Sequence, residues 1–79
     1  MPTVLYDRGF RFYFWSNERN ERPHIHARSD DAYAKVWLGP PVALAESRDC
    51  SPRQVRMVLE VVGDKRAMME QAWHDYFGT

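Results

Sequence analysis

The fold of this 79-residue chain is decided by the stretch PHIHARSDDAYAKVWL, residues 23–38. Side chains of different character alternate in its two halves, which flank the turn residues Ser29, Asp30 and Asp31. Because alternate side chains of a strand point to opposite faces of a sheet, the stretch predicts a hairpin with strands over 24–29 and 32–38. Pro23 suits the start of a strand, since it has no N–H to donate to a neighbour.

A second hairpin is predicted on the N-terminal side, in TVLYDRGFRFYFWSN, residues 3–17. The letters DRG favour a three-residue turn with Gly9 in the left-handed conformation, which gives strands over 3–6 and 10–16. On the C-terminal side, VALA at residues 42–45 is a candidate for a short fifth strand.

The rest of the chain is predicted to be helical. Ser51 is a candidate N-cap, with Pro52 at the first helical position and Gln54 placed to complete a capping box. Apolar residues at helical spacing form two stripes, Val55, Val58, Leu59 and Val62, then Met69, Ala72, Trp73 and Tyr76. A single helix over 52–77 would be about 39 Å long, too long for a sheet of short strands. Two helices with a bend near Gly63 are therefore predicted, with one kinked helix as the alternative.

These elements predict one α+β domain over residues 1–79, with a β-rich half at 1–50 and a helical half at 51–79. The predicted sheet is antiparallel, with four strands in two hairpins and a fifth if residues 42–45 join it. The C-terminal helices are expected to pack on one face of this sheet.

The composition excludes several classes of protein. Eleven basic and eleven acidic side chains give a net charge of +0, so no overall field attracts nucleic acid or a membrane. No apolar run approaches the length of a membrane span or resembles a signal peptide. Cys50 is the only cysteine, which excludes an intrachain disulfide and predicts a cytoplasmic protein.

The strand alternation predicts two unlike sheet faces. One face is apolar and is expected to meet the helices; it carries Phe10, Phe12, Phe14, Ile25, Ala27, Ala32, Ala34, Val36 and Leu38. The other carries Arg11, Tyr13, Trp15, His24, His26, Arg28, Tyr33, Lys35 and Trp37, with no acid among them. A merely solvated face would mix charges and hold fewer rings, so this set predicts a contact surface for a protein or RNA. The structural alternative is that the rings only stabilise the hairpins.

The histidine pair allows three interpretations. As acid and base, His24 and His26 would cleave RNA without a metal, while Arg11, Arg28 and Lys35 hold the phosphate. As metal ligands they are weak candidates, because a site needs three or four ligands. No diagnostic spacing connects the pair to the residues available to complete a site, which are His74, Cys50, Asp30, Asp31 and Asp49. The third interpretation is that both imidazoles only stack and form hydrogen bonds. No metal or other cofactor is predicted.

The chain resembles a small bacterial family catalogued as domain of unknown function 4160. The similarity lies in MPTVL, GFRFYFWSNE, RPHIHAR, AKVWL, the helix start SPRQ and the terminal AWHDYFG. His24 and His26 keep the family's PHxH motif, whereas Arg22 replaces the first proline of its usual Pro-Pro pair. Members are single-domain and often encoded beside another small protein, which implies a toxin–antitoxin-type pair. The resemblance implies no catalytic residues.

The leading functional hypothesis is therefore partner binding within such a two-protein module, through the aromatic and basic sheet face. A small protein encoded by the neighbouring gene is the expected partner, and RNA and a second copy of the chain are further ones. No membrane partner is expected. The ribonuclease and the metal-binding protein are the alternatives, and the sequence leaves open whether the protein is an enzyme.

Overall fold

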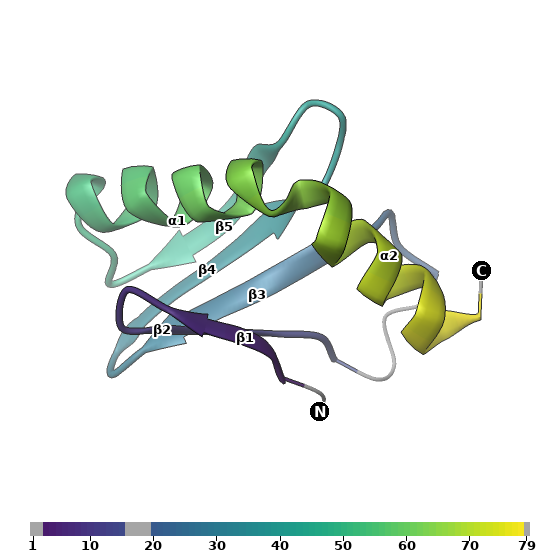
Figure 1. Ribbon diagram of the computed structural model, residues 1–79. Coiled ribbons are helices and arrows are strands. Elements are labelled where there is room, and N and C mark those ends of the chain that lie inside the picture. Colours follow the sequence, from purple (N-terminus) through teal and green to yellow (C-terminus); the bar gives the residue numbers. More distant parts are fainter. Residues whose placement is uncertain (1–2, 16–19, 79) are drawn as a thin grey trace.

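The computed structural model describes residues 3–15 and 20–78 and shows an antiparallel sheet followed by two helices (Figure 1). The described elements are β1 (Thr3–Asp7), β2 (Phe10–Tyr13), β3 (His24–Ser29), β4 (Ala32–Trp37), β5 (Ala43–Arg48), α1 (Pro52–Asp64) and α2 (Arg66–Phe77). The strands are neighbours in chain order, β1-β2-β3-β4-β5. The predicted α+β class is thus confirmed, and the candidate fifth strand is real.

Both predicted hairpins close through tighter turns than the sequence suggested. Arg8 and Gly9 alone join β1 to β2, with φ angles of 51° and 84°. Two central residues with positive φ are typical of the hairpin turn whose twist matches that of the strands. The predicted three-residue turn was therefore wrong, although Gly9 is left-handed as expected. Asp30 and Asp31 form the other turn, while Ser29 belongs to β3.

The strand boundaries differ from the prediction at β2 and β5. The strand predicted over 10–16 ends at Tyr13, with Phe14 and Trp15 outside any strand and residue 16 outside the described part. By contrast, β5 extends to Arg48, beyond the predicted end at Ala45. It pairs with β4 through a bulge between Leu44 and Glu46, an irregularity that the alternation pattern alone did not indicate.

The helical half consists of two helices, as predicted, but they meet at Lys65 rather than at Gly63. The capping box at Ser51 is present. The predicted stripes were wrong in part, since the most buried positions are Val58, Val61 and Val62 on α1, and Met69, Trp73 and Phe77 on α2. Neither described helix is long and apolar enough to cross a bilayer.

The helices pack on the apolar face of the sheet, as expected. The centre of the core is fully buried and includes Phe12, Ile25, Ala27, Ala34, Val36 and Leu38 from the strand region. α1 lies over β4 and β5, and α2 continues beyond the end of the sheet (Figure 1). There Trp73 contacts Phe14 edge to face, with ring centroids 5.5 Å apart.

One arginine anchors the start of α2 to the end of β4. Arg66 donates through Nε to the Leu38 carbonyl at 2.7 Å and through Nη2 to the Gly39 carbonyl at 3.1 Å. The same Nη2 also contacts Glu70 one turn along the helix, at 3.2 Å. These bonds satisfy backbone carbonyls where the strand stops, and they fix the direction in which α2 leaves α1.

The capping box predicts a measurable loss of stability. Ser51→Ala removes the hydroxyl that accepts from the Gln54 N–H, so we expect a loss of about 1 kcal/mol of unfolding free energy. In a thermal melt this corresponds to a decrease in Tm of roughly 4–8 °C. Ser47→Ala, at an exposed position of β5, is the control and should change stability little. Equal melting of both variants and the parent would contradict the role of the cap.

Candidate functional site

The sheet face opposite the helices, here called the aromatic face, is organised in rows that cross the strands. Strand register places one residue of each strand in the first row, here called the arginine row. It consists of Tyr6, Arg11, Arg28, Tyr33 and Arg48. The second row consists of Thr3, Tyr13, His26, Lys35 and Glu46, and the third includes His24, Trp37 and Ala43. The predicted residues that lie in strands therefore do share one face, and each row has a different environment. Trp15 follows β2 and belongs to no row, but its ring contacts those of Tyr13 and His26.

Each guanidinium group of the arginine row lies over a tyrosine ring. Arg11 lies 4.5 Å from the centroid of Tyr13, while Arg28 and Arg48 lie 5.2 Å and 4.7 Å from that of Tyr33. Such cation–π contacts hold the planar groups in place through their faces and not through their N–H donors. Arg11 also donates through Nε to the Thr3 hydroxyl, at 2.8 Å. The row is consequently a set of ordered cations at the surface.

In the second row, the rings of neighbouring residues enclose the side chain of His26. Its imidazole stacks on Tyr13, with centroids 5.3 Å apart, and on Tyr33, with centroids 5.9 Å apart. Its Nδ1 lies 2.7 Å from the Tyr33 hydroxyl, a hydrogen bond in which either atom can donate, depending on the tautomer. The residue is 2% exposed. His26 is therefore an interior group of the face and not a surface group.

His24 connects the third row to the helices. It is 0% exposed, and its ring contacts Trp37 across the strand pair and Trp73 of α2, at centroid distances of 5.6 Å and 5.0 Å. Its Nδ1 lies 2.8 Å from the Arg22 carbonyl oxygen. The two imidazoles stand edge to face, 5.1 Å apart. The PHxH motif thus joins the aromatic face to the end of the core where α2 packs.

The segment before β3 lies at the same end of the aromatic face, where its side chains contact Lys35 and Trp37. Glu21 contacts Lys35, with Oε1 2.7 Å from Nζ, and Arg22 lies 4.2 Å from the Trp37 ring. Glu46 of β5 stands opposite Lys35 in the register. Sequence reasoning missed both acids, because Glu21 comes from a loop and Glu46 lies beyond the strand predicted at 42–45.

The exposed charge of the face is consequently concentrated in the arginine row. Arg28 is exposed, and among the described residues neither it nor Arg11 has a carboxylate within ion-pair distance. Arg48 is 3.7 Å from Glu46 in a solvent-exposed pair, which contributes little to stability. Tyr6 and Trp15 add large exposed rings. Guanidinium groups beside rings can bind carboxylates or phosphates from outside.

The metal interpretation finds no support in the described geometry. Over residues 3–15 and 20–78, no group of three histidine, cysteine, aspartate or glutamate side chains is placed to hold one ion. The additional ligands considered from the sequence, Cys50 and His74 among them, do not gather around the histidine pair.

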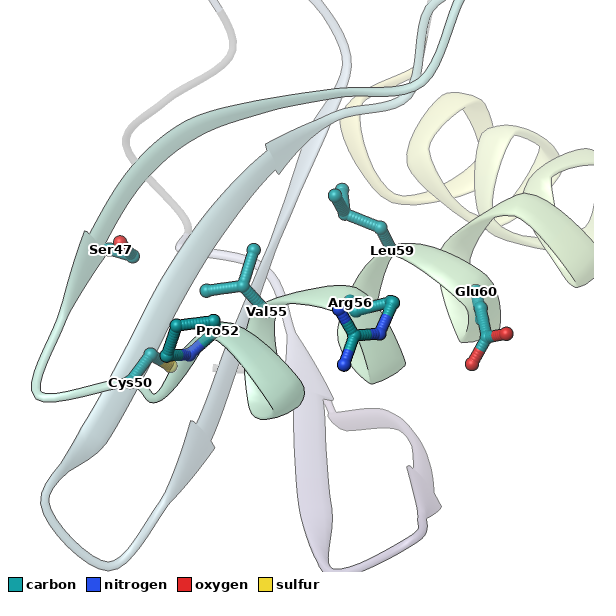
Figure 2. Close-up of a pocket in the computed structure, with 7 residues that line it drawn as sticks. All are labelled: Ser47, Cys50, Pro52, Val55, Arg56, Leu59 and Glu60. Carbon is teal, nitrogen blue, oxygen red and sulfur yellow. The ribbon is translucent and has the colours of Figure 1, made fainter.

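An open hollow lies on the opposite side of the sheet, between β5 and α1 (Figure 2). Its volume is about 660 Å³ and its lining is mainly apolar, with Pro52, Val55 and Leu59 from the helix facing Ser47 of the strand. Cys50 lies at one end, where burial raises the pKa of its thiol and the nearby Asp49 charge adds to the effect. No sequence pattern indicated this hollow, which depends on where α1 crosses β5.

Comparison with known proteins identifies the family alone. The model of the family described as domain of unknown function (DUF4160) matches residues 9–74, a range that contains the histidine pair and most of the aromatic face. No curated protein and no solved structure shows a significant match to the chain.

The His26–Tyr33 bond can be tested by deleting one hydroxyl. Tyr33→Phe keeps the ring that two arginines contact but removes the partner of a buried imidazole nitrogen, so we expect a loss of about 1–3 kcal/mol in urea unfolding. Tyr76→Phe changes an exposed tyrosine and should stay within about 0.5 kcal/mol of the parent. A Tyr33→Phe variant as stable as its control would show that the bond contributes nothing.

The raised pKa of Cys50 predicts slow alkylation. At pH 8 the folded protein holds less thiolate than an unfolded chain, so iodoacetamide should react several-fold more slowly than it does in urea. Because the folded-state pKa is the higher one, the thiol contributes stability below the unfolded pKa and loses it as pH rises through the folded value. Equal alkylation rates with and without urea would contradict this assignment.

Proposed function

We propose that this chain, which belongs to the DUF4160 family, is the partner-binding component of a two-protein module of toxin–antitoxin type. In this proposal an acidic surface of the partner protein lies on the arginine row. The observation that carries it is the row itself, with three ordered guanidinium groups and two tyrosines crossing all five strands on one face.

The composition of the row suits a protein interface. Arginine and tyrosine are enriched where proteins meet, because both combine a flat, partly apolar body with hydrogen-bonding groups. Arg28 stands at the centre, flanked in the register by Arg11 and Tyr33. Placing two like charges opposite each other across a strand pair is unfavourable in the isolated chain, and a partner carboxylate would relieve it.

The charges next to the row favour a protein over RNA. Glu46 and Glu21 lie beside Lys35 of the second row, where a continuous phosphate backbone would meet them. Binding of nucleic acid depends on many phosphate contacts at once, and the chain as a whole has a net charge of +0. An acidic patch of limited size on a protein avoids this conflict.

The burial of the histidines favours binding over catalysis. A general base must come within hydrogen-bond distance of the proton that it removes, yet His24 and His26 are enclosed by rings of their own chain. Lys35, the predicted phosphate ligand, is held by Glu21. In our proposal the imidazoles shape the face from within and do not contact the partner.

The identity of the partner follows from the family context. The family resemblance implies a second small protein encoded nearby, and we infer that the product of the neighbouring gene is the partner. Such a pair would act in the cytoplasm, where a single partly buried cysteine such as Cys50 stays reduced.

Coexpression with the neighbouring gene tests this proposal. A tag on this chain should recover the neighbour, and Arg28→Glu should weaken the complex by roughly tenfold or more, because it places an acid where the partner's acid binds. Arg53→Glu, on the exposed surface of α1, is the matched control and should leave the complex intact. Circular dichroism of both variants verifies that the fold is retained.

Other results would reject the proposal. If the neighbour does not copurify, or copurifies equally with Arg28→Glu, the arginine row is not its binding site. If the purified chain instead cleaves RNA, and a His24→Ala/His26→Ala variant that remains folded does not, the ribonuclease alternative is correct. Tight, salt-dependent RNA binding without cleavage would identify RNA as the partner.

A further inference from the structure

β5 forms an edge of the described sheet, and nearly all of its residues are exposed. An edge strand directs alternate N–H and C=O groups outward, where they can pair with another strand. Proteins usually block such pairing with charges. On β5 the aromatic-face charges are Glu46 and Arg48, which are opposite in sign and two residues apart. The edge therefore carries a charge pattern that can complement itself.

We propose that two copies of this chain form a symmetric dimer by antiparallel pairing of β5 with β5, centred on Ser47. In this register Ser47 stands opposite its own counterpart on the helix side of the sheet. Arg48 of each copy then stands opposite Glu46 of the other on the aromatic face. The pairing is isologous, so the Arg48–Glu46 ion pair forms twice around one two-fold axis.

Neighbouring registers are unfavourable. A pairing that keeps the helices of both copies on one side can also be centred on Glu46 or on Arg48, but these place two carboxylates or two guanidinium groups opposite each other. Like charges that face each other across a strand pair destabilise it. The bulge between Leu44 and Glu46 further limits regular pairing to the segment around Ser47.

The helices of such a dimer would meet over the same axis. Neighbouring strands lie about 4.8 Å apart, and α1 lies above β4 and β5, so the two α1 axes would lie about 10 Å apart, the spacing of packed helices. The hollow of each copy would then open toward the other. Its apolar side chains Val55 and Leu59, which line the hollow on α1 (Figure 2), would then be covered by the second copy.

This interface differs from the one expected from the sequence, in which a second copy of the chain would bind through the aromatic face. Tyr13, Tyr33, His24 and His26 are buried within their own chain, so little of their surface remains for a second copy. The β5 edge and the hollow, in contrast, present exposed backbone and apolar side chains. Arg48 belongs to both surfaces, but the dimer requires no partner protein, and Arg11 and Arg28 of the arginine row lie on other strands. The inference therefore does not depend on the proposed function.

Charge reversal at two positions tests the register. Sedimentation of the purified full chain from micromolar to millimolar concentration should show a monomer–dimer equilibrium. Arg48→Glu and Glu46→Arg should each weaken it by roughly tenfold or more, since each creates like-charge pairs. The double variant Glu46→Arg/Arg48→Glu should regain the dimer, and a mixture of the two single variants should form the heterodimer. Leu59→Asp tests the hollow and should also weaken association.

Each outcome decides the proposal. Recovery in the double variant and in the mixture supports it, because only a register that pairs position 46 with position 48 predicts both. It is overturned if the parent chain stays monomeric at every concentration, or if the single variants dimerise as tightly as the parent. Circular dichroism and thermal melts test whether the variants at the exposed positions 46 and 48, and at the half-buried Leu59, keep the fold.

Discussion

The two-residue alternation of β2, β3 and β4 is the constraint on which the rest of this structure depends. It directs the side chains of Phe12, Ile25 and Val36 toward the helices. It directs the imidazoles, the guanidinium groups and the remaining rings toward the opposite face. A shift of one residue would exchange the faces, burying arginine under α1. The tight turns prevent this shift, since two residues each at Arg8–Gly9 and Asp30–Asp31 leave no length for slippage.

The aromatic face is a second packed layer that lies outside the main core. Burying an imidazole is costly unless its nitrogens find partners, and His26 meets this need through the Tyr33 hydroxyl while its ring stacks between two tyrosines. A network of this kind specifies one arrangement of side chains more strictly than apolar packing does. Here it fixes the Tyr33 ring, and that ring in turn holds Arg28 and Arg48. The buried histidine therefore orders the exposed cations indirectly.

The sequence predicted those features that depend on local pattern. Alternation identified the faces, and the capping box located the start of α1. Features that depend on contacts between helices and strands could not be predicted from the sequence. The burial of His24 depends on α2 passing the end of the sheet, where Trp73 reaches it. The sequence did not predict β5 beyond Ala45, because Glu46 is a weak strand former and the bulge before it interrupts the alternation. The most buried helix positions differ from the predicted stripes because the two helices meet at Lys65. The set of face residues was predictable, whereas their exposure was not.

The two proposed surfaces are linked through Arg48, which ends the arginine row and also lies on the β5 edge. Pairing β5 with β5 around an axis perpendicular to the sheet would keep both aromatic faces on the same side. Arg48 would then be directed to Glu46 of the other copy, which leaves Arg11 and Arg28 of each chain for the partner. One continuous sheet would carry two arginine rows related by symmetry, so a partner that is itself dimeric could engage both at once. Such two-point binding strengthens a complex without any additional contact. Dimerisation through the self-complementary charges of β5 would therefore strengthen the binding of a partner to the cationic face.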